Sequence, residues 1–202
     1  MIISSNYIEH ELSQLIMSIW LASGSARRKQ ILSQIFPKFD CYGVDADESM
    51  IDGAKVEESI QAICERKAEA ANHSNHDLVV VSDTMIVDPK NSKLAIGKPE
   101  NDYQARLILE KLRGEIHTVV SSTGIRINGK WEFFQDSARV KITDYSDENL
   151  EKLVSNESWR GKAGGYDLAG DMRDFAQIES GSEFTVLGIA ENAMLVLQDY
   201  SS

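Results

Sequence analysis

The spacing of apolar residues predicts alternating strands and helices in the first half of the chain. A short apolar run near 18–22 predicts a strand, followed by a helix over 27–36 and a second strand over 39–44. Apolar residues then recur at helical spacing over 56–72. The run Leu78-Val-Val-Val-Ser82 is short and β-branched, which is typical of a buried strand. This order of elements favours parallel strands with helices packed on them.

The second half of the chain shows a different pattern, built around a long hairpin. Two strands are expected within 116–143, joined at Asn128-Gly129, a dipeptide typical of type I′ turns. A short strand over 94–96 and a helix capped by Asn101 precede the hairpin. Another helix is expected over 146–154. An antiparallel hairpin beside parallel units indicates a mixed sheet.

The two ends of the chain complete the expected set of elements. A final strand near 184–190 leads to a helix containing Ala193, Leu195 and Val196. Residues 1–18 carry apolar side chains at helical spacing and are expected to form an additional helix before a single domain over 19–202. We therefore predict the α/β class: a mixed, twisted sheet with flanking helices, arranged as two lobes around a central cleft.

Composition narrows the class of function. The chain has 202 residues and a net charge of −11, from 21 basic and 32 acidic residues. An acidic protein is not expected to bind nucleic acid or anionic membranes without sequence specificity. No run approaches the roughly 18 apolar residues that cross a bilayer. Cys41 and Cys64 are too few for a disulfide framework, so we expect a reducing compartment and a cytoplasmic location.

The segment Leu21-Ala-Ser-Gly-Ser-Ala-Arg-Arg28 carries the strongest chemical signal. Ser23, Ser25, Arg27 and Arg28 lie where the first strand turns into a helix. Hydroxyl donors, exposed backbone N–H groups and paired guanidinium groups suit a polyanion such as a phosphate chain. The segment lacks the Walker A spacing. A solvated surface loop is the alternative interpretation.

Carboxylates follow two of the predicted strands. Asp83 comes directly after the Val-Val-Val run, and Asp45, Asp47 and Glu48 follow the strand over 39–44. The carboxyl ends of strands are where α/β sheets bind ligands, and Mg²⁺ prefers carboxylate and phosphate oxygens. One carboxylate could instead activate water, and a turn-forming role is the alternative for Asp83. The spacing does not decide between these roles.

Three lysines are further candidates for binding an anion. Lys98 lies in the turn Gly97-Lys98-Pro99, Lys162 lies in the glycine-rich loop over 160–166, and Lys67 lies on the helix over 56–72. The alternatives are an exposed turn lysine for Lys98, a flexible connector for the loop, and an i,i+4 ion-pair face for Lys67.

The histidines carry no comparable signal. His73-x-x-His76 has metal-ligand spacing but no third ligand nearby, and we interpret it as not metal-binding. His117 lies in a predicted strand, and we expect it to be structural.

Several of these motifs occur together, in order, over nearly the whole chain. They are Leu21–Arg28, Asp47-Glu48-Ser49, Glu65–Ala68, Ser82-Asp83-Thr84, Gly97-Lys98-Pro99, Gly114-x-x-His117-Thr-Val119 and Lys162–Tyr166. Together they resemble the Maf family of nucleoside triphosphate pyrophosphatases, also called septum-formation inhibitor proteins, whose fold is similar to that of the inosine triphosphatases.

The resemblance implies an activity and a role for each matching residue. The activity is hydrolysis of a nucleoside triphosphate to the monophosphate and pyrophosphate with a divalent cation, Mg²⁺ or Mn²⁺, in a homodimer. Asp83 is then the catalytic carboxylate, and Glu48 and Asp83 hold the metal. Lys162 binds substrate from the second lobe. The other implied substrate contacts are Ser23, Ser25, Arg27, Arg28, Lys67, Thr84 and Lys98.

Five positions depart from the family pattern. Ala26 replaces a proline, Ser82 replaces an alanine, and Gly188-Ile189-Ala190 replaces a closing Gly-Leu-Pro. Ala169 replaces the glutamine that is typical of the dTTP/UTP-preferring branch, although Arg27 and Thr84 match that branch. The sequence therefore leaves the base open. The alternatives are a 7-methyl-GTP-preferring pyrophosphatase of the same family, or a nucleotide-binding regulator of cell division with little turnover.

Overall fold

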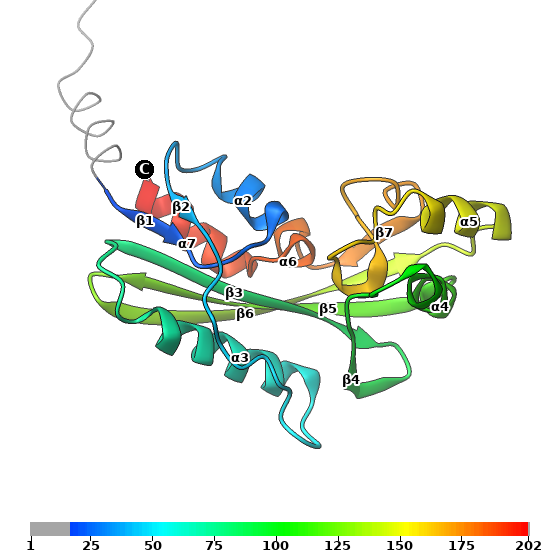
Figure 1. Ribbon diagram of the computed structural model, residues 1–202, viewed down its shortest axis with the longest axis horizontal. Helices are drawn as coiled ribbons and strands as arrows, with labels where there is room; N and C mark the ends of the chain where they lie inside the picture. The colour runs from blue at the N-terminus through cyan, green and yellow to red at the C-terminus, as the bar shows by residue number, and fades with distance from the viewer. Residues whose placement is uncertain (1–16, 202) are drawn as a thin grey trace, which may run out of the picture.

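The structure is a computed structural model that describes residues 17–201, and one seven-stranded mixed sheet organises them (Figure 1). The strand order is β2-β1-β3-β5-β6-β7, and β4 also pairs with β3. Strand β1 is parallel to β2 and β3, whereas the other pairings are antiparallel. The strands are β1 (Ile19–Leu21), β2 (Asp40–Cys41), β3 (Leu78–Asp88), β4 (Asn91–Ile96), β5 (Ile116–Ile127), β6 (Lys130–Ile142) and β7 (Ala176–Ser180).

One edge of β3 is shared by two short strands that leave a gap between them. Strand β1 pairs with Leu78–Val80, and β4 pairs with Ile86–Asp88. Among the described residues, the intervening stretch 82–85 is paired only on its other edge, with β5. This gap opens the middle of β3 to the space between β1 and β4.

Helices cover both faces of the long strands. Helix α3 lies on one face, and α2, α6 and α7 lie on the other (Figure 1). Leu78 and Val80 pack in the cluster with α2 and α7, whereas Val79 and Val81 pack with α3. The Val-Val-Val run is therefore buried on both faces, as its sequence predicts. The helices are α2 (Ala26–Leu32), α3 (Val56–Ala71), α4 (Asp102–Leu112), α5 (Asp147–Ser155), the 3-10 turn η1 (Ala163–Gly165), α6 (Glu183–Leu187) and α7 (Glu191–Ser201).

A second hydrophobic cluster forms the other lobe. Helices α4 and α5 pack there against the far end of the hairpin, with Leu109, Leu112, Leu150 and Ile142 at its centre. The prediction of a mixed sheet with two lobes is confirmed. The hairpin turn is also confirmed, because Asn128 and Gly129 have φ angles of 51° and 76°, the left-handed region that a type I′ turn requires.

The expected strand near 184–190 is wrong. Residues Glu183–Leu187 form helix α6, which begins where the Ser182 side chain accepts a hydrogen bond from the Phe184 N–H and ends at Gly188, with φ 118°. Its β-branched Thr185 and Val186 resemble a strand in sequence, but the cap and the left-handed glycine favour one helical turn. The last strand of the sheet is instead β7, which the sequence pattern did not predict.

Other boundaries differ by a few residues. The strand predicted over 39–44 is only Asp40–Cys41, and the one beginning at Leu78 continues to Asp88. The helix expected within 1–18 lies outside the described residues except for its last two positions, so it stays a prediction. No helix within 17–201 has the length and apolar character needed to cross a membrane.

His117 gives the fold a pH dependence that can be measured. Its side chain is 1% exposed, and its Nε2 lies 2.8 Å from the Tyr166 hydroxyl. Burial lowers the pKa of His117 from 6.5 to about 4. Between these two values the unfolded chain binds a proton that the native protein does not. The free energy of unfolding therefore falls as the pH is lowered through this window, by at most about 1.4 kcal/mol per pH unit.

Between pH 7 and pH 5, we expect the titration of His117 to lower the free energy of unfolding of wild type by about 2 kcal/mol, as measured by urea unfolding. The variant His117→Gln keeps a hydrogen-bonding group for Tyr166 but cannot titrate. Its free energy of unfolding should depend less on pH by that amount, because all other titrating groups are shared. Equal pH dependence in the two proteins would contradict a neutral, buried imidazole.

Candidate active site

A cavity of about 850 Å³ opens at the gap between β1 and β4, between the two lobes. Its wall includes the loop after β1, the middle of β3, helix α3 and the loops before α4 and η1. All ten predicted site residues line it: Ser23, Ser25, Arg27, Arg28, Glu48, Lys67, Asp83, Thr84, Lys98 and Lys162. The structure therefore brings together segments that are up to 139 positions apart, from Ser23 to Lys162.

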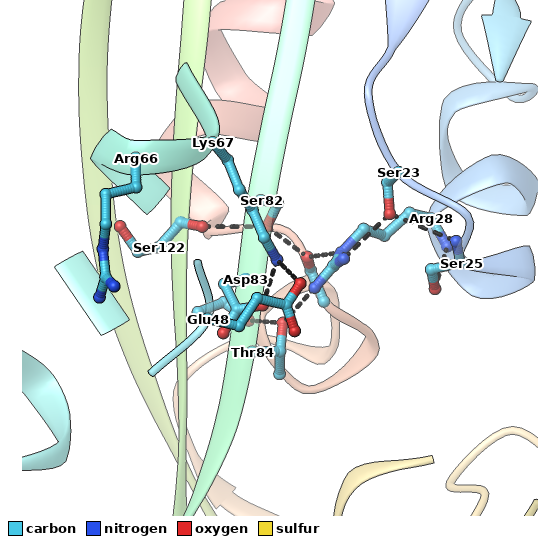
Figure 2. A network of polar contacts seen from close by, with 12 residues as sticks. Ser23, Ser25, Arg28, Glu48, Arg66, Lys67, Ser82, Asp83, Thr84 and Ser122 are labelled. Atoms are coloured by element: carbon cyan, nitrogen blue, oxygen red, sulfur yellow. Dashed lines mark hydrogen bonds and ion pairs between the residues drawn. The ribbon is translucent and has the colours of Figure 1, made fainter. Parts of the chain in front are cut away.

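Lys67 joins the two candidate carboxylates at the floor of this cavity (Figure 2). Its Nζ lies 2.7 Å from Asp83 Oδ1 and 2.8 Å from Glu48 Oε1. Lys67 is 7% exposed, and the Glu48 side chain is 59% exposed. The alternative of an i,i+4 ion pair for Lys67 is therefore wrong, because its ammonium group contacts Asp83 of the sheet and not a neighbouring side chain of α3.

Both carboxylates have the chemistry of a divalent-cation site. The hydrogen bond from Lys67 lowers the pKa of Glu48, and the charges of Lys98 and Arg28 act in the same direction. Within 17–201, no group of three or more His, Cys, Asp or Glu side chains is placed to hold a metal. A cation at Glu48 and Asp83 would therefore take its remaining ligands from phosphate oxygens and water, as Mg²⁺ commonly does.

His76, the second histidine of the candidate pair, contacts neighbouring side chains. His76 Nε2 lies 3.0 Å from Asp40 Oδ2, and its Nδ1 lies 2.5 Å from the Ser74 hydroxyl. Both ring nitrogens thus have local partners that fix a loop beside β2.

The loop after β1 is organised by its two serines. Ser25 caps α2 by accepting a hydrogen bond from the Arg28 N–H, at 3.5 Å. Ser23 is 6% exposed, and its hydroxyl accepts from the Ser25 N–H at 3.3 Å and from Arg28 Nη1 at 3.0 Å. The serines therefore shape the loop in this structure and place the arginines at the cavity.

The two adjacent arginines are not equivalent. Arg28 donates to the Gly188 carbonyl at 2.7 Å, to Thr84 Oγ1 at 2.9 Å and to Ser23 Oγ (Figure 2). Arg27 forms no hydrogen bond or ion pair with the described residues; burial lowers the pKa of its guanidinium, while the charge of Asp167 acts in the opposite direction. A desolvated guanidinium without a partner gains most from an incoming anion. Arg27 is thus the free donor of the pair, whereas Arg28 is largely occupied.

Lys98 and Lys162 lie on loops that touch. The Gly164 N–H donates to the Gly97 carbonyl at 3.0 Å, which joins the turn before α4 to the loop of η1. Lys162 Nζ donates to the Ser158 carbonyl and lies 3.4 Å from Asp167 Oδ2. Lys98 is exposed. Both lysines line the cavity from the second lobe, and the charge of Lys98 acts on Glu48, whereas the Lys162 ammonium group contacts Ser158 and Asp167.

Sequence reasoning gave no role in the site to other residues of the wall, among them Arg160, Met50, Met85 and Ala95. Arg160 lies in the basic loop that the sequence singled out, where it pairs with Glu157 and covers the Trp159 ring, its guanidinium carbon 4.7 Å from the ring centroid. The other three pack together against α3 and β5. No local signal marks them, because an apolar wall of a cavity and an ordinary core have the same sequence pattern.

Comparison with known proteins identifies the same chain-wide pattern. The model of the Maf-like protein family matches residues 18–197. A protein of Pyrococcus abyssi named dTTP/UTP pyrophosphatase is 32% identical over 173 residues, which cover 85% of this chain and 89% of that protein. A protein of the same name from a Ruegeria species is 31% identical over 183 residues, covering 89% and 93%.

A solved structure also matches part of the chain. The Staphylococcus aureus Ham1 protein matches 63% of this chain and 72% of its own, with 20% identity and a TM-score of 0.44.

Proposed function

This chain belongs to the Maf family, and from that premise we propose that it hydrolyses nucleoside triphosphates to the monophosphate and pyrophosphate. The observation that carries the proposal is the pairing of Asp83 and Glu48 through buried Lys67 at the floor of a cationic cavity. Carboxylates repel phosphates unless they hold a cation or act on water, and the second of these roles is one that a protein binding nucleotides without turnover does not need.

In this reaction water attacks the α-phosphorus, and the bond to the oxygen that bridges the α- and β-phosphates breaks. Asp83 Oδ1 accepts a hydrogen bond from Lys67, which leaves Oδ2 to take a proton from the attacking water. The Lys67 ammonium group fixes the orientation of the carboxylate. Glu48 and Asp83 would hold the divalent cation, which neutralises charge on the phosphate oxygens when bound.

The remaining cations suit the departing pyrophosphate. Arg27 enters from the first lobe, and Lys98 and Lys162 enter from the second lobe. Ser25 and Thr84 line the wall between them. Charge on the transferred and leaving phosphates is then neutralised from both sides of the cavity, which is the arrangement that stabilises phosphoryl-transfer transition states.

We expect pyrimidine triphosphates to be the preferred substrates, with weak discrimination. The relatives named dTTP/UTP pyrophosphatase support the pyrimidine. Ala169, however, is exposed and does not line the cavity, and it offers no amide to a base. A site that lacks one base-reading hydrogen bond loses much of its selectivity.

The test is product analysis over a panel of canonical nucleotides and 7-methyl-GTP, with Mg²⁺ or Mn²⁺ and with a chelator. We expect metal-dependent release of pyrophosphate and a monophosphate, with dTTP and UTP within about tenfold of the other bases. Orthophosphate and a diphosphate as products would refute the reaction. A strong preference for 7-methyl-GTP would favour the related branch, and binding without turnover would favour a regulator of cell division.

A further inference from the structure

Four hydroxyl side chains form a buried patch behind the loop of Arg28, on the face of β3 and β5 that α6 covers. Ser82 pairs with Thr123 across the two strands, and Thr84 pairs with Ser121. The paired hydroxyl oxygens are 3.1 and 2.8 Å apart. Ser82, Ser121 and Thr123 are at most 1% exposed. Each hydroxyl has one hydrogen to donate, so the direction of each bond follows from its neighbours.

The first pair leads to the carbonyl that holds Arg28. The Ala190 N–H donates to Thr123 Oγ1 at 3.0 Å, which leaves the Thr123 hydrogen for Ser82 Oγ. Of the two carbonyls within reach of the Ser82 hydroxyl, that of Gly188 is the nearer, at 2.8 Å. The same carbonyl accepts from Arg28 Nε at 2.7 Å. A continuous chain of hydrogen bonds, here called a relay, therefore runs from the Ala190 N–H through Thr123 and Ser82 to the Gly188 carbonyl. This carbonyl accepts a hydrogen bond from the Arg28 guanidinium.

The second pair begins at Arg28 itself. Its Nη2 donates to Thr84 Oγ1 at 2.9 Å. The Ser121 hydroxyl donates to the Thr185 carbonyl at 2.7 Å, so Thr84 is the donor within its pair with Ser121. Both relays thus connect the guanidinium to carbonyls of α6 or its C-terminal cap.

We propose that Ser121 and Thr123 are positioning residues for substrate binding, which act through Thr84, Ser82 and the Gly188 carbonyl to fix Arg28. Neither of the two lines the cavity, so neither touches the substrate. The proposal rests on the proposed function, because it takes a nucleoside triphosphate as the ligand.

A guanidinium has five N–H donors, and Arg28 uses three of them on the protein. The two that remain have fixed directions only while these three bonds hold. An arginine that is pre-organised in this way loses little conformational freedom when an anion binds. The relays are therefore expected to act on substrate affinity, with a smaller effect on the rate of the chemical step.

The variant pair Thr123→Val and Thr123→Ser tests this role. Valine keeps the shape and removes the hydroxyl, whereas serine keeps the hydroxyl. We expect Thr123→Val to weaken the binding of α,β-imido-dUTP with Mg²⁺ about tenfold in titration calorimetry, and Thr123→Ser to bind within threefold of wild type. Ser121→Ala, which interrupts the second relay, should weaken binding similarly and provides an independent variant if Thr123→Val does not fold.

Two further measurements separate positioning from a general loss of stability. The Arg28 Nε–H proton, followed by NMR, should exchange with solvent faster in Thr123→Val but not in Thr123→Ser. In an Arg28→Lys background, Thr123→Val should change the dissociation constant less than twofold. An unchanged Nε–H exchange rate, or an equal loss of affinity in both backgrounds, would overturn the proposal. Failure of wild type to bind the analogue would instead refute the proposed function, while the exchange rates still test the relays.

Discussion

Replacing Asp83 with asparagine is expected to lower kcat about a thousandfold, which is within the range for loss of a general base. Asparagine keeps the size of the side chain and can still contact Lys67, but it accepts no proton from water and is a poor ligand for a hard cation. The measurement is pyrophosphate release at saturating metal and nucleotide, together with thermal unfolding to show that the variant stays folded.

The same strand offers a matched control. Asp88 is also a buried carboxylate of β3, 5% exposed and bonded to Lys111, but it does not line the cavity. Asp88→Asn should lose stability, because the buried carboxylate loses its ion pair with the half-exposed Lys111, while kcat stays within about twofold of wild type. Comparable loss of kcat in both variants would show that β3 tolerates no change of carboxylate and would remove Asp83 from its catalytic role.

The chemistry of the site could be predicted from the sequence because each segment carries its own local signal. A carboxylate after a buried strand, as at Asp83, and a lysine between glycine and proline, as at Lys98, are recognisable without knowing the fold. The ordered occurrence of several such segments identified the family, and the family placed them around one cleft. The cavity of the structure contains every residue so assigned.

The origin of the cleft could not be predicted in the same way. It depends on β1 and β4 pairing with different ends of one edge of β3, which leaves 82–85 open. Both pairings are long-range, and the sequence indicated β3 only as far as Ser82. The different roles of Arg27 and Arg28 were equally hidden, because they depend on the Gly188 carbonyl, 160 positions from Arg28. That carbonyl belongs to the segment that was wrongly predicted as a strand.

The position of Lys67 between the carboxylates also has a consequence for metal binding. In this structure one ammonium group forms an ion pair with both Asp83 and Glu48, where the proposed cation would bind. A variant without the ammonium group of Lys67 therefore tests the metal site. A divalent cation can replace the lost positive charge only if the carboxylates of Asp83 and Glu48 are its ligands.

Lys67→Met is therefore expected to lower the free energy of unfolding by about 3 kcal/mol without metal, since the Asp83 side chain, 14% exposed, is left without its ion-pair partner. That loss corresponds to a Tm lower by roughly 10 °C for a chain of this size. Millimolar Mn²⁺ should raise the Tm of the variant by several degrees more than that of wild type, because binding to the native state alone stabilises it.

Two variants decide whether this rescue reports the proposed metal site. Lys111→Met breaks another lysine–aspartate pair of β3, outside the cavity, and should gain no extra stabilisation from Mn²⁺. The double variant Lys67→Met/Asp83→Asn should also lose the extra shift, because one of the two ligands is gone. If Mn²⁺ shifted the Tm of wild type, Lys67→Met and Lys111→Met by the same amount, the cation would bind elsewhere. The carboxylates of Asp83 and Glu48 would then serve the reaction as bases or as orienting groups, held by the ion pairs that Lys67 forms with both of them.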